Sequence, residues 1–223
     1  RRVMAAAKPT KTTKTAKRRK PTDTRSVSDK LIDGALDLAA THLWRDMSLA
    51  QIAEHAGIPL GDALMTLSGK AKVLKALNKR IDAEVLGGLE KDPLDGSIKD
   101  KLFDVLMRRF DALEGRQAAM ASIVADVARD PMLVACLTPQ FKKSMSLSLQ
   151  AAGVTTDGGR GLIKIETLGI IYMNAFRVWL KDTDAGFAAT MSALDKDLAR
   201  AEKFAESIPN LKRRTETGEA EAA

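Results

Sequence analysis

The sequence has few of the residues that build covalent cross-links, metal sites or catalytic centres. Its one cysteine, Cys136, cannot form a disulfide within the chain, and its apolar neighbours predict that it is buried. The histidines, His42 and His55, share no metal-ligand spacing with each other or with carboxylates. A Ser/His/Asp order, a glycine-rich phosphate loop and paired carboxylates are also missing. We therefore expect no metal, no other cofactor and no enzymatic activity.

Long apolar runs are missing as well. The most apolar stretch, residues 161–180, is interrupted by Lys164, Glu166, Asn174 and Arg177, which excludes an integral membrane segment there. The apolar run that a secretory signal needs is also absent. We therefore expect a cytoplasmic protein.

Aromatic residues make up only 4% of the chain, and stretches rich in β-branched residues are rare. Both shortages disfavour β-sheets. The chain is instead rich in Ala, Leu, Lys and Met, which favour helices. The composition therefore predicts an all-α fold.

Positive charge is concentrated at the N-terminus. Residues 1–27 contain ten of the 36 basic residues but only Asp23 of the 29 acidic ones, a net charge of +9. The remaining 26 basic and 28 acidic residues leave the rest of the chain at −2. Because this segment contains little that could be buried, we predict a disordered basic arm over residues 1–27. Such an arm attracts polyanions such as DNA, or it serves as a solubilising tail.

Capping residues and apolar periodicity divide the rest of the chain into helices. The predicted helices span residues 29–41, 48–56, 59–67, 70–89, 97–113, 117–128, 131–152, 162–181 and 184–206. The seventh is expected to be interrupted before Pro139. Glycine and proline at 87–96 separate two domains, residues 28–90 and 97–207, and a flexible tail follows at 208–223. In the last helix, Phe187, Met191, Leu194, Leu198 and Ala201 form a seam for another helix.

Residues 48–67, SLAQIAEHAGIPLGDALMTL, have the pattern of a helix-turn-helix motif. Ser48 and Gln51 can form a capping box, and Gly57 permits the sharp turn. We expect Ile52 to pack inward and Leu64 to close the small core between the two helices.

Residues 31–77 resemble the N-terminal domain of TetR-type transcriptional regulators, through ALDLA, SLAQIAEHAGI and GKAKVL. This resemblance implies a headpiece of three or four helices and a C-terminal helical domain for ligand binding and dimerisation. It implies a homodimer through residues 162–206 that binds double-stranded DNA and an apolar small-molecule effector. It also implies that Lys70 contacts a phosphate.

The third helix of the headpiece departs from that family, because residues 59–67 contain no basic, aromatic or amide side chain. Residues 28–90 hold seven basic and nine acidic residues, a net charge of −2. DNA contacts are therefore expected to depend on the arm as well as on the headpiece. The predicted DNA-binding residues are Lys17, Arg18, Arg19, Lys20, Arg25, Ser48, Gln51, Leu60, Gly61, Thr66 and Lys70.

Residues 171–202, IYMNAFRVWLKDTDAGFAATMSALDKDLARAE, are similar to the C-terminal part of TetR-like ubiquinone-biosynthesis accessory proteins. This resemblance implies an alternative function, the binding of a lipid or quinone without reading DNA sequence. No strongly amphipathic helix follows Pro209, however. Both functions require an apolar pocket. The alternative is that the candidate lining residues simply pack in the core. The candidate lining residues are Met107, Phe110, Met120, Ile123, Val127, Met145, Tyr172, Phe176 and Trp179.

Overall fold

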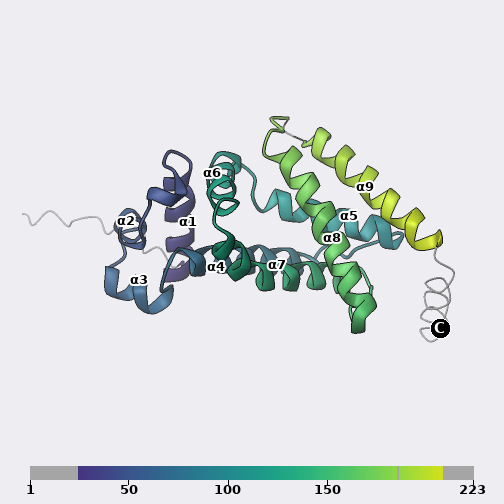
Figure 1. Ribbon diagram of the computed structural model, residues 1–223, viewed down its shortest axis with the longest axis horizontal. Coiled ribbons are helices and arrows are strands. Elements are labelled where there is room, and N and C mark those ends of the chain that lie inside the picture. The colour runs from purple at the N-terminus through teal and green to yellow at the C-terminus, as the bar shows by residue number, and fades with distance from the viewer. Residues whose placement is uncertain (1–24, 185, 208–223) are drawn as a thin grey trace, which may run out of the picture.

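The computed structural model describes residues 25–184 and 186–207, and within these ranges it is entirely helical (Figure 1). The elements are α1 (Val27–Ala39), the short 3-10 helix η1 (Trp44–Asp46), α2 (Leu49–His55), α3 (Leu60–Thr66), α4 (Lys70–Gly88), α5 (Ile98–Asp111), α6 (Gln117–Val127), α7 (Pro131–Ala151), α8 (Gly158–Trp179) and α9 (Ala188–Ser207). The predicted all-α fold is confirmed. None of the described helices is long and apolar enough to span a membrane.

Side-chain caps fix the start of several helices. The Ser26 side chain accepts a hydrogen bond from the backbone of Asp29 at the start of α1. Ser97 and Asp100 form a reciprocal capping box at the start of α5, which satisfies backbone N–H groups that lack helical partners. Asp130 caps α7, and Pro131 occupies the first turn, where its missing N–H is not needed.

The C-terminal helices differ from the prediction in α7, in α8 and in α9, which begins at Ala188 rather than at residue 184. Helix α7 continues through Pro139 rather than breaking before it. The helix tolerates this proline because α7 packs along α4 on one side and α8 on another. Helix α8 begins at Gly158, inside the predicted loop, because Asp157 has the extended backbone of a helix cap.

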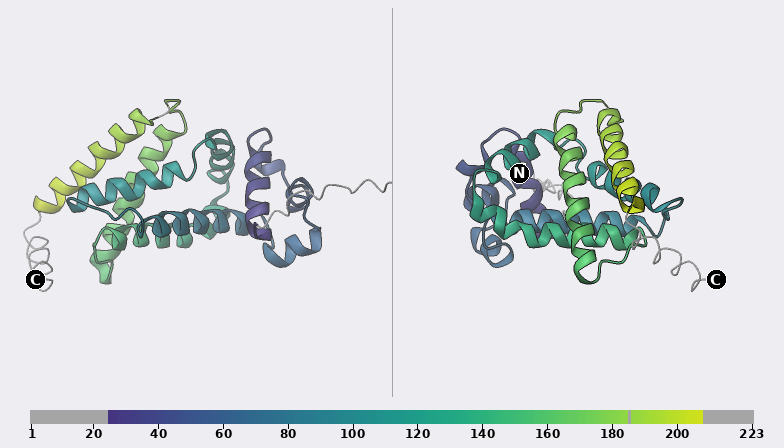
Figure 2. Two further views of the ribbon diagram at one scale, coloured as in Figure 1. Left: turned by 180° about the vertical axis from the view of Figure 1, so that it is seen from behind. Right: turned by 45° about the vertical axis from the view of Figure 1, so that its right-hand side comes forward.

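The helices form an elongated molecule with the headpiece at one end and the α8–α9 pair at the other (Figures 1 and 2). Helix α1 packs against α2, α3, α4 and α6. Helix α4 leaves the headpiece and packs against α5 and α7, so it belongs to both halves of the molecule. The longest shared surface lies between α8 and α9, which run side by side (Figure 2).

Cys136 is exposed on α7, so the prediction that it is buried is wrong. Leu133 and Leu137, four residues apart, provide the half-buried face of this part of the helix. The residues between them, including Val134, point toward solvent. The run of apolar residues around Cys136 therefore does not show that all of them are buried, because this part of α7 has only one packed face.

Candidate nucleic-acid interface

Helices α2 and α3 form a tight corner at the end of the molecule (Figure 1). The Ser48 hydroxyl accepts from the backbone N–H of Gln51, and the Gln51 side-chain oxygen accepts from the N–H of Ser48. Gly57 has a φ of 66°, a left-handed conformation that favours glycine, and the chain reverses there before Pro59. Ser48 and Gln51 therefore act first as the capping box of α2.

The small core of this corner is formed by Ile52, Ala53 and Ala63, which are fully buried, together with Leu67. Leu64 is 48% exposed, so the expectation that it closes this core is wrong. Ala63 and Leu67, four residues apart, lie on the same face of α3, and Leu64 is turned away from that face.

Close packing of α1 beneath α2 explains a glycine in the middle of a helix. A Cβ atom on Gly34 would lie 3.1 Å from the Cβ of Ala56 and 3.3 Å from the carbonyl oxygen of Ile52. A larger residue would push α2 away from α1. Gly34 therefore fixes the position of α2 and, through it, of α3.

The solvent face of α3 is apolar. Leu60 is 46% exposed and Met65 is 89% exposed, and open space surrounds Gly61 between them. The Thr66 hydroxyl donates to the carbonyl oxygen of Asp62 at 2.7 Å, so its proton is used within the helix. Apart from the Asp62 carboxylate, this face offers methyl and methylene groups and carries no charged donor.

Lys70, the first residue of α4, is bound within the protein. Its Nζ donates to the carbonyl oxygens of Trp44, at 2.7 Å, and Arg45, at 3.2 Å, and lies 5.3 Å from the centre of the Trp44 ring. Burial lowers the pKa of Lys70, against an opposing effect of Asp126 and Asp46. Since an ammonium group has three N–H donors, one remains for a ligand.

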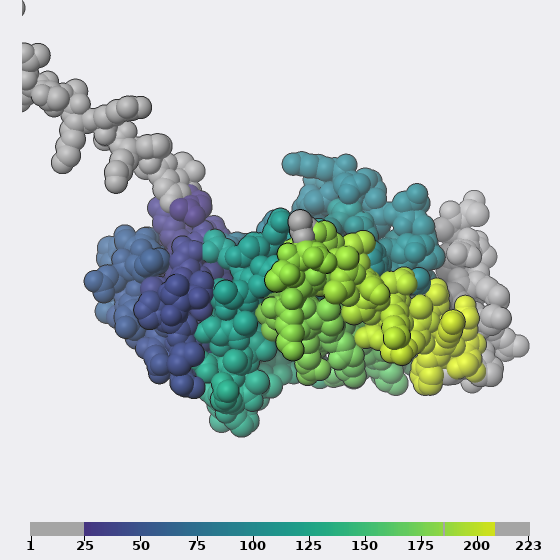
Figure 3. Space-filling model, turned by 90° about the horizontal axis from the view of Figure 1, so that it is seen from above, coloured from purple at the N-terminus to yellow at the C-terminus, as the bar shows by residue number. Residues whose placement is uncertain are grey.

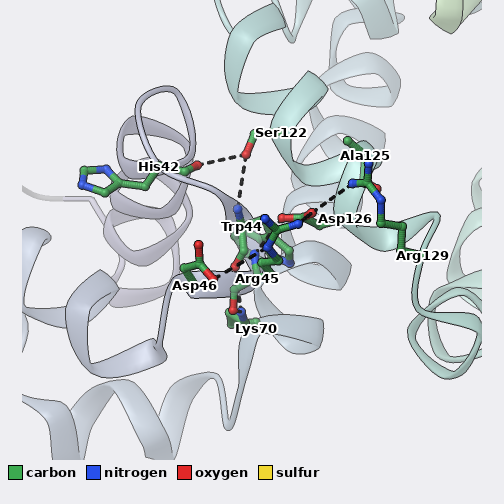
Figure 4. Close-up of polar contacts among 9 residues, drawn as sticks. All are labelled: His42, Trp44, Arg45, Asp46, Lys70, Ser122, Ala125, Asp126 and Arg129. Atoms are coloured by element: carbon green, nitrogen blue, oxygen red, sulfur yellow. Dashed lines mark hydrogen bonds and ion pairs between the residues drawn. The ribbon is translucent and has the colours of Figure 1, made fainter.

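Helix α6 holds the turn at η1 through two side chains (Figure 4). The Ser122 hydroxyl donates to the carbonyl oxygen of His42 at 2.9 Å and accepts from the N–H of Trp44 at 3.2 Å. The buried carboxylate of Asp126 accepts from the N–H of Arg45 at 2.8 Å. These contacts fix the headpiece to α6.

Cations near the corner come from α4, from η1 and from the residues before α1. The exposed cationic side chains of the headpiece include Arg45, Lys72 and Lys79. Arg25 lies 2.7 Å from Asp33, which also pairs with Arg80. The other cations predicted to bind DNA, Lys17, Arg18, Arg19 and Lys20, lie outside the described residues.

The residues predicted to line a pocket fall into separate groups. The rings of Phe110, Tyr172, Phe176 and Trp179 pack together, with the centres of contacting rings 5.2 to 6.4 Å apart, and Met145 is fully buried nearby in the same core. Met107 lies half-buried on α5. The remaining candidates, Met120, Ile123 and Val127, lie on α6, which packs against α1.

A buried polar network joins α4 to α5 and α7, and the sequence patterns did not reveal it. The Arg109 guanidinium lies 2.5 Å from an Asp82 oxygen and donates to Asn78 at 2.9 Å. The other Asp82 oxygen accepts from Ser144 at 2.6 Å. Arg109 also lies 5.5 Å from the centre of the Tyr172 ring, so the network reaches α8. The sequence did contain a sign of buried charge, because Arg109 and Asp82 interrupt the apolar faces of their helices.

A cavity of about 10 Å³ lies beside this network and is lined partly by Arg109 and Ser148. It is large enough for at most one water molecule. The buried Nε of Arg109 has no hydrogen-bond partner.

No protein-family model and no curated protein matches the sequence. Solved structures do match the fold. A TetR transcriptional regulator from Nitrosomonas europaea superposes with a TM-score of 0.66 at 20% identity, over 80% of this chain and 99% of that one. The chain has the TetR fold. Two further TetR regulators match with TM-scores of 0.54: one from Rhodococcus at 18% identity, over 76% of this chain and 94% of that one, and one from Streptomyces coelicolor at 19%, over 84% and 86%.

Within the TetR fold, the α2–α3 corner lies at the end farthest from α9 (Figure 1). The corner is presented to solvent, and its supporting contacts come from α1, which in turn packs against α4 and α6. The arrangement suits insertion of α3 into a groove, because the residues that would meet a ligand are not needed for packing.

Proposed function

We propose that the protein is a dimeric DNA-binding transcriptional regulator of the TetR type, acting in the cytoplasm. The observation that carries this proposal is the solvent-exposed helix-turn-helix corner at the end of a TetR fold. In such motifs the second helix lies in the major groove. Here α3 takes that place, and Ser48, Gln51, Leu60, Gly61 and Thr66 lie on or beside the surface that would face DNA.

Affinity for the phosphate backbone comes mainly from outside α3. The basic arm over residues 1–27, including Lys17 to Lys20 and Arg25, supplies the positive charge that the headpiece lacks. Lys70 has a structural role at η1 and offers its remaining N–H to a phosphate. In this arrangement the basic arm attracts the duplex without regard to its sequence, and Lys70 helps to position the headpiece on it.

A salt-dependent binding assay tests this proposal. Full-length protein should bind duplex DNA at about 50 mM salt, with an affinity that falls steeply as salt rises. Removal of residues 1–24 should reduce the slope of that dependence. The proposal fails if the full-length chain binds no duplex at low salt.

Dimerisation through residues 162–206 is supported by the outer faces of α8 and α9. Leu162, Ile163 and Ile170 are more than 60% exposed on α8, and Phe204 is 69% exposed on α9. The two helices form a continuous face at the end away from the headpiece (Figure 3). An apolar face of this kind is typical of a protein–protein interface.

We place the effector between α4, α5, α7 and α8, where Phe110, Tyr172, Phe176 and Trp179 form an aromatic core. The adjoining cavity of about 10 Å³ is far smaller than a ligand pocket. An apolar ligand would therefore have to select a more open conformation, which changes the position of α4. Native mass spectrometry with small apolar compounds tests this part of the proposal.

The second candidate is a lipid- or quinone-binding accessory protein, favoured by the donor-poor surface of α3 and the internal contacts of Lys70. This function predicts a hydrophobic molecule that co-purifies with the chain and no duplex binding by the headpiece. Native mass spectrometry of freshly purified protein, beside the salt-dependent assay, distinguishes the two candidates.

A further inference from the structure

The exposed surface of α3 has a chemistry that limits which bases it can recognise. Leu60 and Leu64, four residues apart, lie along one side of the helix and are about half-exposed, whereas Met65, about 100° further round the helix, is almost fully exposed. Gly61 leaves open space beside them. The one ionisable group on this side is the Asp62 carboxylate, which accepts hydrogen bonds but donates none.

Each base pair presents a different set of groups in the major groove. Guanine offers two acceptors, which are read by bidentate arginine or lysine, and adenine is read by asparagine or glutamine. Helix α3 contains none of these side chains. Thymine alone offers a C5-methyl group, which apolar side chains contact, and cytosine offers an N4 amino group, which a carboxylate accepts from.

We propose that α3 selects DNA by apolar contact of Met65, Leu64 and Leu60 with thymine methyl groups, with Asp62 accepting from cytosine N4 at a neighbouring position. This inference rests on the DNA-binding function proposed above and names the sequence class that it reads. Met65, the most exposed of these side chains, makes the principal contact. Its flexible thioether adapts to the irregular surface of methyl groups in the groove.

The helix geometry supports DNA over a second protein as the occupant of this face. Leu60 and Leu64 remain about half-exposed on a helix that lies at the tip of the molecule and packs against α1 and α2 at its inner side. A narrow, protruding helix fits a groove about 12 Å wide. The acidic groups Asp62 and Glu54 are tolerated there because the backbone contacts come from cations elsewhere in the chain.

Replacement of thymine by uracil tests the inference, since uracil lacks only the methyl group. Full-length protein is first used to select duplexes from a random pool of about 30 bp, roughly three helical turns, at about 50 mM salt. The selected duplexes are then made with dU in place of dT. Each methyl group that is buried at the interface should contribute about fourfold to affinity, so the loss of two should weaken binding roughly 15-fold.

Met65→Ala then identifies the side chain that reads the methyl groups. In a double-mutant cycle the preference for dT over dU should fall in Met65→Ala by about fourfold. Met132→Ala is the matched control, because Met132 is an exposed methionine on α7 outside the corner. It should keep the full preference. Circular dichroism verifies that both variants are folded.

The outcomes separate this inference from the function on which it rests. If no duplex is selected, DNA binding itself is refuted. If duplexes bind but dU and dT forms bind equally, the protein binds DNA and thymine recognition is overturned. Thymine recognition by Met65 is also overturned if Met65→Ala retains the wild-type ratio of dT to dU affinity, which would leave the apolar face of α3 for a protein partner.

Discussion

Arg109 is a buried cation at the centre of a polar network in the interior of the molecule. Its guanidinium pairs with Asp82 between α5 and α4, and both side chains are buried. A buried charge that loses its partner is far more costly than a pair replaced as a whole. The same pair also joins α4, which leaves the headpiece, to α5.

Arg109→Met should therefore destabilise the protein by about 3–5 kcal/mol, because Asp82 is left buried without a counter-charge. The double variant Arg109→Met with Asp82→Leu should recover much of this loss. Urea unfolding followed by circular dichroism measures both. If the single variant loses no more stability than the double variant, the buried unpaired carboxylate is not the cause of the loss.

Asp182 gives the protein a component of acid sensitivity. Burial by itself raises the pKa of Asp182, but hydrogen bonds from the N–H and hydroxyl of Thr190, at 2.8 and 2.7 Å, outweigh it and leave the pKa below the ordinary 3.8. A lowered pKa stabilises the fold above pH 3.8, and this stabilisation is lost as the pH falls through the lowered pKa.

Asp182→Asn should accordingly cost about 2 kcal/mol at neutral pH, since hydrogen bonds to the charged carboxylate are lost. The difference from the wild type should begin to shrink below pH 3.8, where the unfolded carboxyl takes up a proton, and should disappear as the pH falls through the lowered pKa of the folded protein. Thermal unfolding from pH 7 to pH 3 measures the effect. An equal difference in stability between the wild type and the variant at every pH would show that the charge of Asp182 does not contribute to stability.

At the scale of secondary-structure elements, the contact between α1 and α2 controls the position of α3, the helix proposed to enter the major groove. Gly34→Leu should destabilise the protein by about 1–3 kcal/mol and weaken DNA binding, because α2 has to move away from the added side chain. Gly87→Leu is the matched control, since a Cβ at this helical glycine meets nothing within 4 Å. Equal losses in both variants would exclude steric crowding as the cause.

The sequence predicted elements well where their signals are local. The capping box of Ser48 and Gln51 and the glycine turn at Gly57 were read from neighbouring residues, and the structure contains both. Leu64 and Cys136 were misassigned because the buried face of a short or one-sided helix is set by its partners. The pairing of Arg109 with Asp82 spans 27 residues and depends on how α4 lies against α5, which no local pattern encodes.

The position of the candidate site could be predicted from the sequence, but the hydrogen-bond partners of its side chains could not. The sequence located the corner at residues 48–67, where α2 and α3 lie. It did not reveal that the ammonium group of Lys70 is held by the carbonyl oxygens of Trp44 and Arg45. Those oxygens are brought near only after η1 packs against α6 through Ser122.

At the scale of the whole molecule, the distance between two headpieces decides whether a dimer can engage two half-sites, which lie one helical turn or a multiple apart. In the proposed dimer that spacing is set at the opposite end of each chain, by the face of α8 and α9. Ile163 and Ile170, 66% and 63% exposed, are the residues of α8 on which charge would be least tolerated in such an interface.

The double variant Ile163→Glu with Ile170→Glu should therefore sediment as a monomer at micromolar concentration, where the wild type sediments as a dimer, because a buried unpaired carboxylate opposes association. Helix α8 lies away from the headpiece (Figure 1), and both isoleucines are exposed, so each monomer should remain folded and bind a half-site weakly. Met132→Glu, which places the same charge on an exposed position of α7, should leave the dimer intact. A variant that stays dimeric with both substitutions would place the interface elsewhere, and the spacing of the headpieces would then have to be derived from another face.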